Sequence, residues 1–128
     1  NLNARWLLTQ ACLPVLRKSA DAAVVFVLDD PTRVVKAYWG AYGITQAANE
    51  AMVRMLHQET ERSVVRVSGL KPGPMRTPLR SRAFVDEALL RVAGPEAYAE
   101  ACVHLLSAEG VAQRGTVHSP EPALVAIA

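Results

Sequence analysis

Several features that mark other classes of protein are scarce in this chain of 128 residues. Its longest apolar run, residues 22–28, is seven residues long, whereas a membrane-spanning helix needs about 20. The net charge is +2, without a block of like charges, which gives no indication of binding to nucleic acid or to an anionic membrane. Only two cysteines occur, Cys12 and Cys102, both among apolar residues and outside any Cys-x-x-Cys pair. We therefore expect two buried, reduced thiols and a cytoplasmic protein.

The residues that are abundant favour an α/β fold with a parallel sheet. Hydrophobic residues make up 51% of the chain and aromatic residues only 5%, so that Val, Ala and Leu supply most of the apolar surface. Strands of this kind are typically buried on both faces beneath helices. Apolar runs predict strands at residues 23–28, 64–70 and, more briefly, 113–118. Helical spacing predicts helices at residues 1–18 and 39–61, from Pro95 to about Gly110, and a short one at 85–92.

Three of these predicted elements carry further expectations. Pro14 lies within the first helix, and we expect a kink or an early end there. The helix that begins at Pro95 should bury one face, made of Tyr98, Ala101, Cys102, Leu105 and Leu106. Residues 72–94 form a long connection, and connections of this length are typically lids or substrate loops.

The pattern of helices and strands describes part of a doubly wound sheet. No Gly-x-Gly-x-x-Gly sequence follows any predicted strand, so the turn that binds a dinucleotide pyrophosphate is not found among these residues. Three strands would also leave an open apolar edge. We expect residues 1–128 to be a single partial domain, completed by a further segment or by another copy of the chain. The helices at 1–18 and 39–61 are apolar on more than one side, and Trp6 and Trp39 lie in or beside them, which favours a homodimer or homotetramer.

One stretch, Gly40-Ala41-Tyr42-Gly43-Ile44-Thr45-Gln46, stands between two of the predicted strands. The strand before it ends in Asp29-Asp30-Pro31, and the strand after it runs into Pro72-Gly73-Pro74-Met75-Arg76-Thr77. This order resembles the C-terminal half of a short-chain dehydrogenase/reductase. Asn1-Leu2-Asn3-Ala4, Leu8-Thr9-Gln10-Ala11 and Pro95-Glu96 strengthen the resemblance, which covers nearly the whole chain and is closest to bacterial reductases of oxoacyl carrier proteins.

The resemblance implies positions for a catalytic set and a cofactor loop. Tyr42 matches the family's proton-transferring tyrosine, and Asn1 matches the asparagine of its proton relay. Pro72, Gly73, Met75 and Thr77 match the loop that touches the nicotinamide, so that NAD(P) is the expected cofactor and a small carbonyl compound or acyl chain the expected substrate. Two positions depart from the family: Asp29 stands where a serine is usual, and Gln46 stands where a lysine is usual.

Both departures disfavour ionisation of the tyrosine. A unit charge at about 4 Å contributes roughly 4 kcal/mol at an effective dielectric of about 20, an upper bound of about three pKa units. As a carboxylate, Asp29 cannot donate a hydrogen bond to a substrate oxygen, although a protonated Asp29 could. Gln46 can still bond a ribose hydroxyl. The sequence therefore predicts an NAD(P)-dependent oxidoreductase with weakened or altered activity; the alternative is a pseudoenzyme that serves as a dimerising or regulatory subunit.

The remaining polar residues indicate no second site. Asp29 and Asp30 have no histidine spaced to join them, so we expect no metal and interpret them as a turn before Pro31. His57, His104 and His118 share no spacing and are interpreted as structural or solvated. The basic residues of the long connection could receive a phosphate or an acidic carrier protein, but a solvated loop is the favoured interpretation. They are Lys71, Arg76, Arg80 and Arg82.

Overall fold

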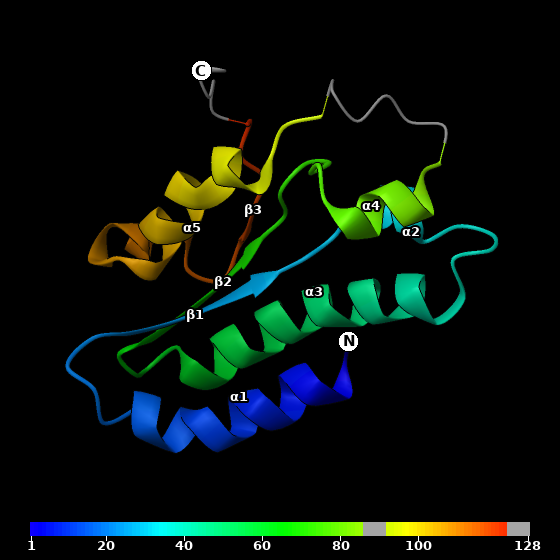
Figure 1. Ribbon diagram of the computed structural model, residues 1–128. Helices are drawn as coiled ribbons and strands as arrows, with labels where there is room; N and C mark the ends of the chain where they lie inside the picture. Colours follow the sequence, from blue (N-terminus) through cyan, green and yellow to red (C-terminus); the bar gives the residue numbers. More distant parts are fainter. Residues whose placement is uncertain (86–91, 123–128) are drawn as a thin grey trace.

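The computed structural model describes residues 1–85 and 92–122 as three layers, with a parallel sheet between two layers of helices (Figure 1). Its longer helices are α1 (Asn3–Leu16), α3 (Gly40–Thr60) and α5 (Ala99–Leu106). Shorter turns are α2 (Pro31–Val34), α4 (Pro78–Ala83), η2 (Pro95–Tyr98) and η3 (Ala108–Gln113). The strands are β1 (Ala22–Val27), β2 (Val65–Leu70) and β3 (Val117–His118). The predicted α/β class is confirmed.

The sheet has the order β1-β2-β3, and both pairings are parallel. Ala22 lies opposite Val65 and Val27 lies opposite Leu70, so that β1 and β2 are paired along their whole length. Every residue of β2 is buried, as expected for a central strand covered by helices on both faces. Since parallel strands point the same way, the segments that follow β1 and β2 emerge at one edge of the sheet.

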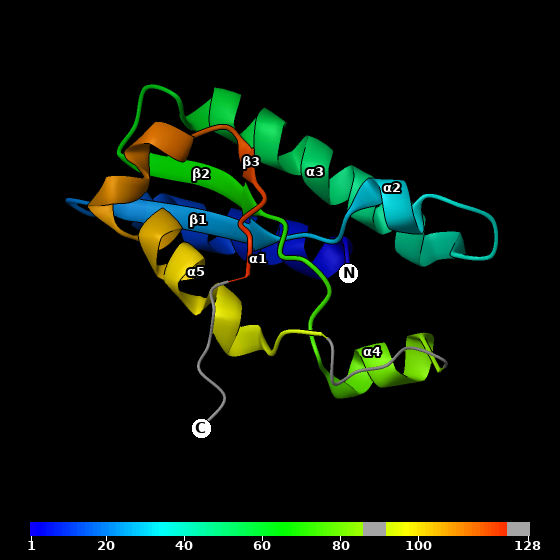
Figure 2. The same ribbon diagram turned by 90° about the horizontal axis from the view of Figure 1, so that it is seen from above.

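Helices α1 and α3 cover one face of the sheet, and α5 lies on the other (Figures 1 and 2). The core on the first side is formed by Phe26, Val53 and Val67 with their neighbours, and Leu13 and Leu16 of α1 pack against it. No residue of α1 is fully buried, and Trp6, Leu7, Leu8 and Val15 are exposed. Helix α1 therefore presents one apolar side to the sheet and leaves another uncovered. Helix α1 continues through Pro14 and ends at Leu16, so it does not stop at the proline as one of the two expectations had it.

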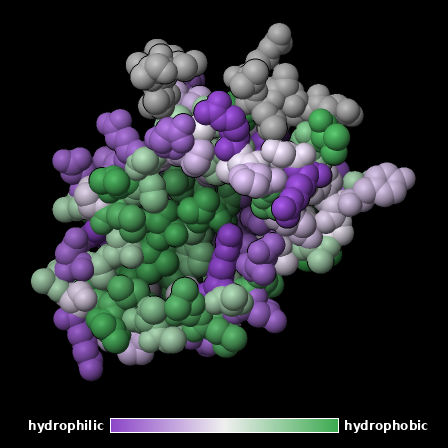
Figure 3. All heavy atoms as spheres, viewed as in Figure 1, coloured by the Kyte–Doolittle hydropathy of each residue, from purple (hydrophilic) through white to green (hydrophobic). Residues whose placement is uncertain are grey.

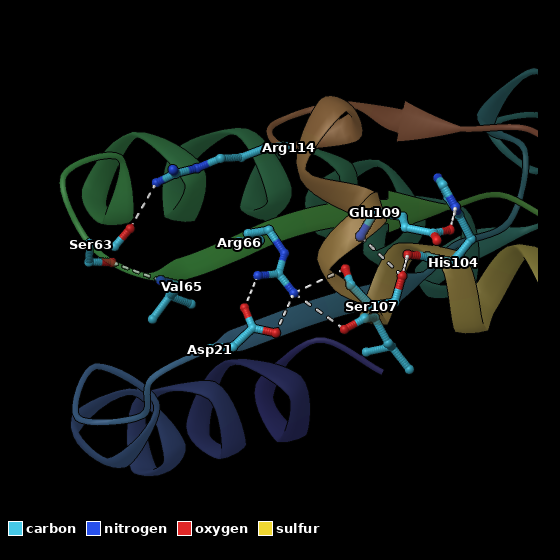
Figure 4. A network of polar contacts seen from close by, with 9 residues as sticks. Asp21, Ser63, Val65, Arg66, His104, Ser107, Glu109 and Arg114 are labelled. Carbon is cyan, nitrogen blue, oxygen red and sulfur yellow. Dashed lines mark hydrogen bonds and ion pairs between the residues drawn. The ribbon is translucent and has the colours of Figure 1, made fainter.

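The amino ends of the strands are held together by a buried arginine of β2 (Figure 4). Arg66 donates hydrogen bonds to both carboxylate oxygens of Asp21, just before β1, and to the carbonyl oxygens of Leu106 and Ser107, at the end of α5. Only 8% of Arg66 is exposed. One side chain thus joins the start of β1 to the end of α5. Arg114 acts in a similar way at the end of α3, where it donates to the carbonyls of Thr60, Glu61 and Ser63.

Several sequence-based expectations were wrong in detail. The segment from Pro95 to Gly110 is not one helix, because it comprises η2, α5 and η3 in succession. Leu106 is 49% exposed, since α5 ends there and the side chain lies outside the face that contacts the sheet. Cys12 is exposed and Cys102 is half-buried, so the prediction of two buried thiols fails. The predicted helix at 85–92 falls mostly on residues 86–91, which lie outside the described residues.

An apolar surface is visible where the first strand lies. In Figure 3 a hollowed apolar area faces the viewer, over the region where Figure 1 shows β1 between α5 and α1. Ala23, Val24 and Val25 of β1 are only half-buried there, and the far edge of this strand has no partner among the described strands. No helix among residues 1–85 and 92–122 is long and apolar enough to span a membrane.

Candidate active site at the carboxyl edge of the sheet

A cavity of about 360 Å³ opens at the carboxyl edge of β1 and β2. This edge is where open α/β sheets usually hold their ligands. Its walls come from the segment after β1, the first turns of α3 and the loop after β2. The lining includes Arg5, Val27, Leu28, Asp29, Arg33, Trp39, Tyr42, Gln46, Pro72, Gly73, Pro74, Met75, Thr77, Leu79, Arg80, Ala83 and Phe84.

Asp29 and Tyr42 are directly bonded in this cavity. The Tyr42 hydroxyl donates a hydrogen bond of 2.8 Å to Oδ2 of Asp29. The other carboxylate oxygen, Oδ1, accepts the backbone N–H of Asp30 at 2.7 Å. The only proton of the tyrosine hydroxyl is therefore already directed at a carboxylate, and a substrate oxygen would have to compete with Asp29 for it.

The same arrangement changes the acidity of the tyrosine. Burial first, and then the hydrogen bond to Asp29 and its negative charge, raise the pKa of Tyr42 from 10.0 to about 12; the positive charge of Arg5 acts in the opposite direction. At pH 8 an ordinary tyrosine is about 1% phenolate, whereas one of pKa about 12 is roughly 0.01% phenolate. The sequence-based expectation that Asp29 would disfavour the phenolate agrees with this shift.

Gln46 lies one turn after Tyr42 on α3 and is buried, with 3% of its surface exposed. Its Oε1 accepts the backbone N–H of Asp29 at 3.1 Å, which fixes the orientation of the amide. The amide nitrogen has no hydrogen-bond partner among the described residues, and Gln46 belongs to the lining of the cavity. Gln46 thus supports the strand end and keeps N–H donors for a ligand.

The loop after β2 forms the opposite wall. Pro72 is buried, and Gly73 passes so close to Tyr98 that an added Cβ would lie 2.6 Å from the tyrosine hydroxyl oxygen. Thr77 caps α4, because its side chain accepts the backbone N–H of Arg80 at 3.2 Å, and Pro78 occupies the first helical position. Sequence reasoning missed α4, although a threonine followed by a proline is a signal for the start of a helix.

The segment between β1 and α3 is organised by its own polar residues. Asp30 caps α2 by accepting the backbone N–H and the hydroxyl of Thr32, and Pro31 begins that turn, so the interpretation of a turn is confirmed. Gly43 allows α2 to touch α3, since a Cβ there would lie 2.2 Å from the carbonyl oxygen of Val34. The result places Tyr42 beside Asp29 rather than away from the sheet.

Most of the sequence-predicted site residues meet in this cavity. Asp29, Tyr42, Gln46, Pro72, Gly73, Met75 and Thr77 all line it. Asn1 does not line it: its backbone carbonyl accepts a 3.4 Å hydrogen bond from the side chain of Asn49, a buried residue of α3. The roles of all eight residues stay predictions.

Sequence reasoning missed Arg5, Arg33 and the aromatic part of the lining, and it named Arg80 only among the basic residues of the long connection, with a solvated loop as the favoured interpretation. Arg5 and Arg33 contribute positive charge, and Trp39 packs against both Tyr42 and Phe84, with ring centroids 5.7 and 5.8 Å apart. Arg80 lies over the ring of Phe84, 4.2 Å from its centroid. These residues lie on four separate segments, and no spacing in the sequence relates them.

Comparison with known proteins defines the family. The family described as "Enoyl-(Acyl carrier protein) reductase" matches residues 1–119. Together with the parallel sheet and the cavity at its carboxyl edge, this match establishes that the chain belongs to the short-chain dehydrogenase/reductase family. Among curated proteins, the uncharacterized oxidoreductase YciK of Escherichia coli (strain K12) is 40% identical over 87 residues, which are 68% of this chain and 34% of that protein.

Solved structures of the same family share the fold. A structure described as a short-chain dehydrogenase from Pseudomonas syringae has a TM-score of 0.85 and 33% identity, and the match covers 91% of this chain and 48% of that one. A structure from Escherichia coli CFT073, complexed with NADPH, has a TM-score of 0.85 and 32% identity, and covers 94% of this chain and 50% of that one. The chain spans about a third of the length of the curated relatives that it matches.

Proposed function

We propose that the chain is the C-terminal half of an NAD(P)-dependent oxidoreductase that acts on a carbonyl or alcohol substrate with weakened activity. The observation that carries this proposal is the meeting of Asp29, Tyr42, Gln46 and the Pro72–Thr77 loop around one cavity. In this proposal the half that holds the pyrophosphate packs against the open edge of β1, where the apolar surface of Figure 3 would be covered.

The cavity residues fit the nicotinamide end of such a cofactor. The amide nitrogen of Gln46 offers N–H donors to a ribose hydroxyl, and the backbone of Gly73 to Thr77 offers polar groups to the carboxamide. The cofactor would supply the hydride that the carbonyl carbon receives. Tyr42 would place its hydroxyl at the carbonyl oxygen and supply the proton.

The weakness of this proton transfer follows from the contacts of Tyr42. Its hydroxyl donates to Asp29 and its pKa is about 12, so it is both occupied and less acidic than an ordinary tyrosine. A lysine at the position of Gln46 would oppose this effect, but glutamine carries no charge. Cofactor binding and catalysis are therefore expected to separate, with binding retained and reduction slow.

Calorimetric titration of the full-length protein with NADPH and NADH, followed by a reduction assay, tests the proposal. We expect micromolar binding of at least one dinucleotide and slow reduction of simple carbonyl compounds. The 128-residue chain alone should bind weakly, since the glycine-rich turn that holds the pyrophosphate is not among its residues. A full-length protein that binds neither dinucleotide would contradict the proposal.

A second candidate, a pseudoenzyme that dimerises or regulates a partner, is favoured by the Asp29–Tyr42 hydrogen bond alone. It differs from the first in one measurement: cofactor binding without any detectable turnover, at any pH, supports the pseudoenzyme. Both proposals therefore predict cofactor binding, and the measurement of turnover distinguishes them.

We further propose that the protein is a cytoplasmic homo-oligomer that pairs through α1 and α3. The outer sides of these helices carry exposed apolar residues, among them Leu7, Leu8 and Ile44, and a groove of about 270 Å³ runs between the two helices. Both cysteines are free thiols, as is typical of a reducing compartment. A monomer by light scattering at micromolar concentration would count against this interface.

A further inference from the structure

The lining of the cavity carries more positive than negative charge, and a neutral carbonyl substrate would not need this excess. Arg5 from α1 and Arg33 from α2 line it, with Arg80 of α4 at its rim, and Asp29 is the one carboxylate among the lining residues that lie within 1–85 and 92–122. Both oxygens of that carboxylate already accept hydrogen bonds, from Tyr42 and from the backbone of Asp30. The described lining of the cavity therefore has an excess of positive charge beside apolar walls.

Arg5 is the most informative of the three. Its Nη1 is fully buried and has no hydrogen-bond partner among residues 1–85 and 92–122. A buried donor of a charged group without an acceptor costs free energy, and native proteins rarely leave one unpaired without a reason. Arg5 is also close enough to Tyr42 for its charge to lower the pKa of that hydroxyl. The guanidinium of Arg5 therefore lies within electrostatic reach of the reacting end of the proposed site.

Arg33 lines the same cavity from α2, the short helix after β1. Its guanidinium makes no hydrogen bond with the described residues, and its charge acts on Asp30, whose pKa is lowered mainly by a hydrogen bond from Thr32. Asp30 is already bonded to Thr32 and lies 4.0 Å from Lys71, and it does not line the cavity. Among the residues that the structure describes, Arg33 therefore has no hydrogen bond or ion pair inside the cavity.

The apolar part of the lining indicates the rest of the ligand. Trp39 and Phe84 pack against each other with tilted rings, and Met75 of the loop after β2 and Leu79 of α4 line the same cavity. A ligand that fits both parts has an apolar body and one anionic group. Arginine binds carboxylate and phosphate oxygens through paired N–H donors, so either anion satisfies the same contacts.

Resting on the proposed function, we infer that the substrate of this site is an anionic carbonyl compound, whose carboxylate or phosphate is bound by Arg5 and Arg33 while its carbonyl oxygen faces Tyr42. Arg80 adds positive charge at the rim, where it also covers the ring of Phe84. The arginines would thereby select the substrate and hold its carbonyl against the tyrosine.

Calorimetry on the full-length protein, with and without saturating NADPH, tests this inference with three probes. Phenylpyruvate carries the carboxylate, its methyl ester is neutral, and phenyl phosphate carries the alternative anion. We expect phenylpyruvate or phenyl phosphate to bind at least about tenfold more tightly than the ester, and the tighter of the two identifies the anion. Equal binding of the ester and both anions, or no binding of any probe, overturns the inference.

Matched variants assign the preference to the arginines. Arg5→Gln and Arg33→Gln should each reduce the preference for the anion to about threefold or less, and Arg5→Lys should retain part of it because the charge remains. Arg62→Gln, a change at an exposed arginine outside the cavity, is the control and should leave the preference intact. An unchanged preference in both glutamine variants, with melting temperatures like that of the control, refutes the assignment.

Cofactor binding separates this inference from the function on which it rests. If the glutamine variants lose NADPH affinity as much as they lose phenylpyruvate affinity, the arginines serve the cofactor and the inference is wrong. If NADPH binds and the anions are not preferred, the proposed oxidoreductase function stands and the inference of an anionic substrate is wrong. If NADPH does not bind but the anion preference is present and depends on Arg5, the site is an anion site and the oxidoreductase proposal fails.

Discussion

Replacing Asp29 by serine and Gln46 by lysine together should raise carbonyl reduction by the full-length protein at least about tenfold. The expected magnitude follows from the tyrosine, whose pKa is raised from 10.0 to about 12 by burial first and then by the hydrogen bond and charge of Asp29. Burial stays in the variant, whereas the effect of Asp29 is removed and the charge of the lysine introduced at position 46 opposes what remains. If about half of a change in acid strength appears in the rate, two units correspond to roughly tenfold, or about 1.4 kcal/mol of barrier. Asp29→Ser also releases the Tyr42 hydroxyl from its carboxylate acceptor.

The change Gln46→Lys should also lower the stability of the protein, for a reason visible in the structure. Oε1 of Gln46 accepts the backbone N–H of Asp29, and an ammonium group cannot accept a hydrogen bond. Leaving that buried N–H without a partner should cost about 1–3 kcal/mol of stability. Asp29→Ser with Gln46→Met is the matched control, because methionine loses the same hydrogen bond without adding a charge.

The assay is a full double-mutant cycle, in which kcat/KM for carbonyl reduction is measured against pH and NADPH affinity is measured in parallel. Because both changes act on one proton transfer, the pair should exceed the sum of the single effects, and the pH at which the rate changes should fall. The reasoning is refuted if the methionine control gains as much as the lysine variant, or if the pair gains nothing while NADPH still binds.

Three further predictions concern other contacts. Gly73→Ala should weaken NADPH binding severalfold, since the new Cβ would meet the Tyr98 hydroxyl, and Tyr98→Phe in the same chain should restore most of the affinity. Asp21→Asn should flatten the fall in urea midpoint below about pH 4: the hydrogen bond from Arg66 lowers the pKa of Asp21, so its contribution is complete above the unfolded value near 3.8 and is lost as the pH falls through the lower folded value. Arg114→Ala should destabilise the protein by about 1–3 kcal/mol in chemical denaturation, because the carbonyl oxygens of Glu61 and Ser63 lose the donor that Arg114 gives them and that of Thr60 keeps only its bonds from Ser63.

Each of these has an outcome that contradicts it. For Gly73, equal affinities of the single and the double variant would mean that the tyrosine hydroxyl is not the obstacle. For Asp21, a parallel fall of both urea midpoints below pH 4 would show that its ion pair does not titrate. For Arg114, a loss no greater than that of Arg62→Ala, a change at an exposed arginine, would show that solvent replaces the donor.

The sequence predicted the frame of this molecule from local patterns and much of its cavity from the family resemblance. The strands at 22–27 and 65–70 and the helix at 40–60 agree with apolar runs and helical spacing to within a residue or two. Asp29, Tyr42 and Pro72–Thr77 were expected in one site because of the resemblance to the short-chain dehydrogenase/reductase family, and they line one cavity. No spacing in the sequence relates Arg5 to Arg33. The two side chains line the same cavity only because α1 and α2 pack around α3.

Two misses have physical causes of a different kind. Gln46 carried no sign in the sequence that its oxygen would hold the backbone of Asp29, since that bond needs the tertiary approach of α3 to β1. The break of the segment from Pro95 to Gln113 into three short helices was hidden by its continuous helical spacing. Ser107 interrupts it by capping η3: its hydroxyl accepts the backbone N–H of Glu109.

The Arg66 contacts give the molecule one fixed end and one free end. Asp21, Leu106 and Ser107 are tied to the second residue of β2, at the end of the sheet opposite the cavity. A movement of the segments that follow Leu28 and Leu70 would leave these contacts of Arg66 intact. Such a movement would change the shape of the mouth of the cavity. The packing of α5 on the sheet, and with it the hydrophobic core, would stay as it is.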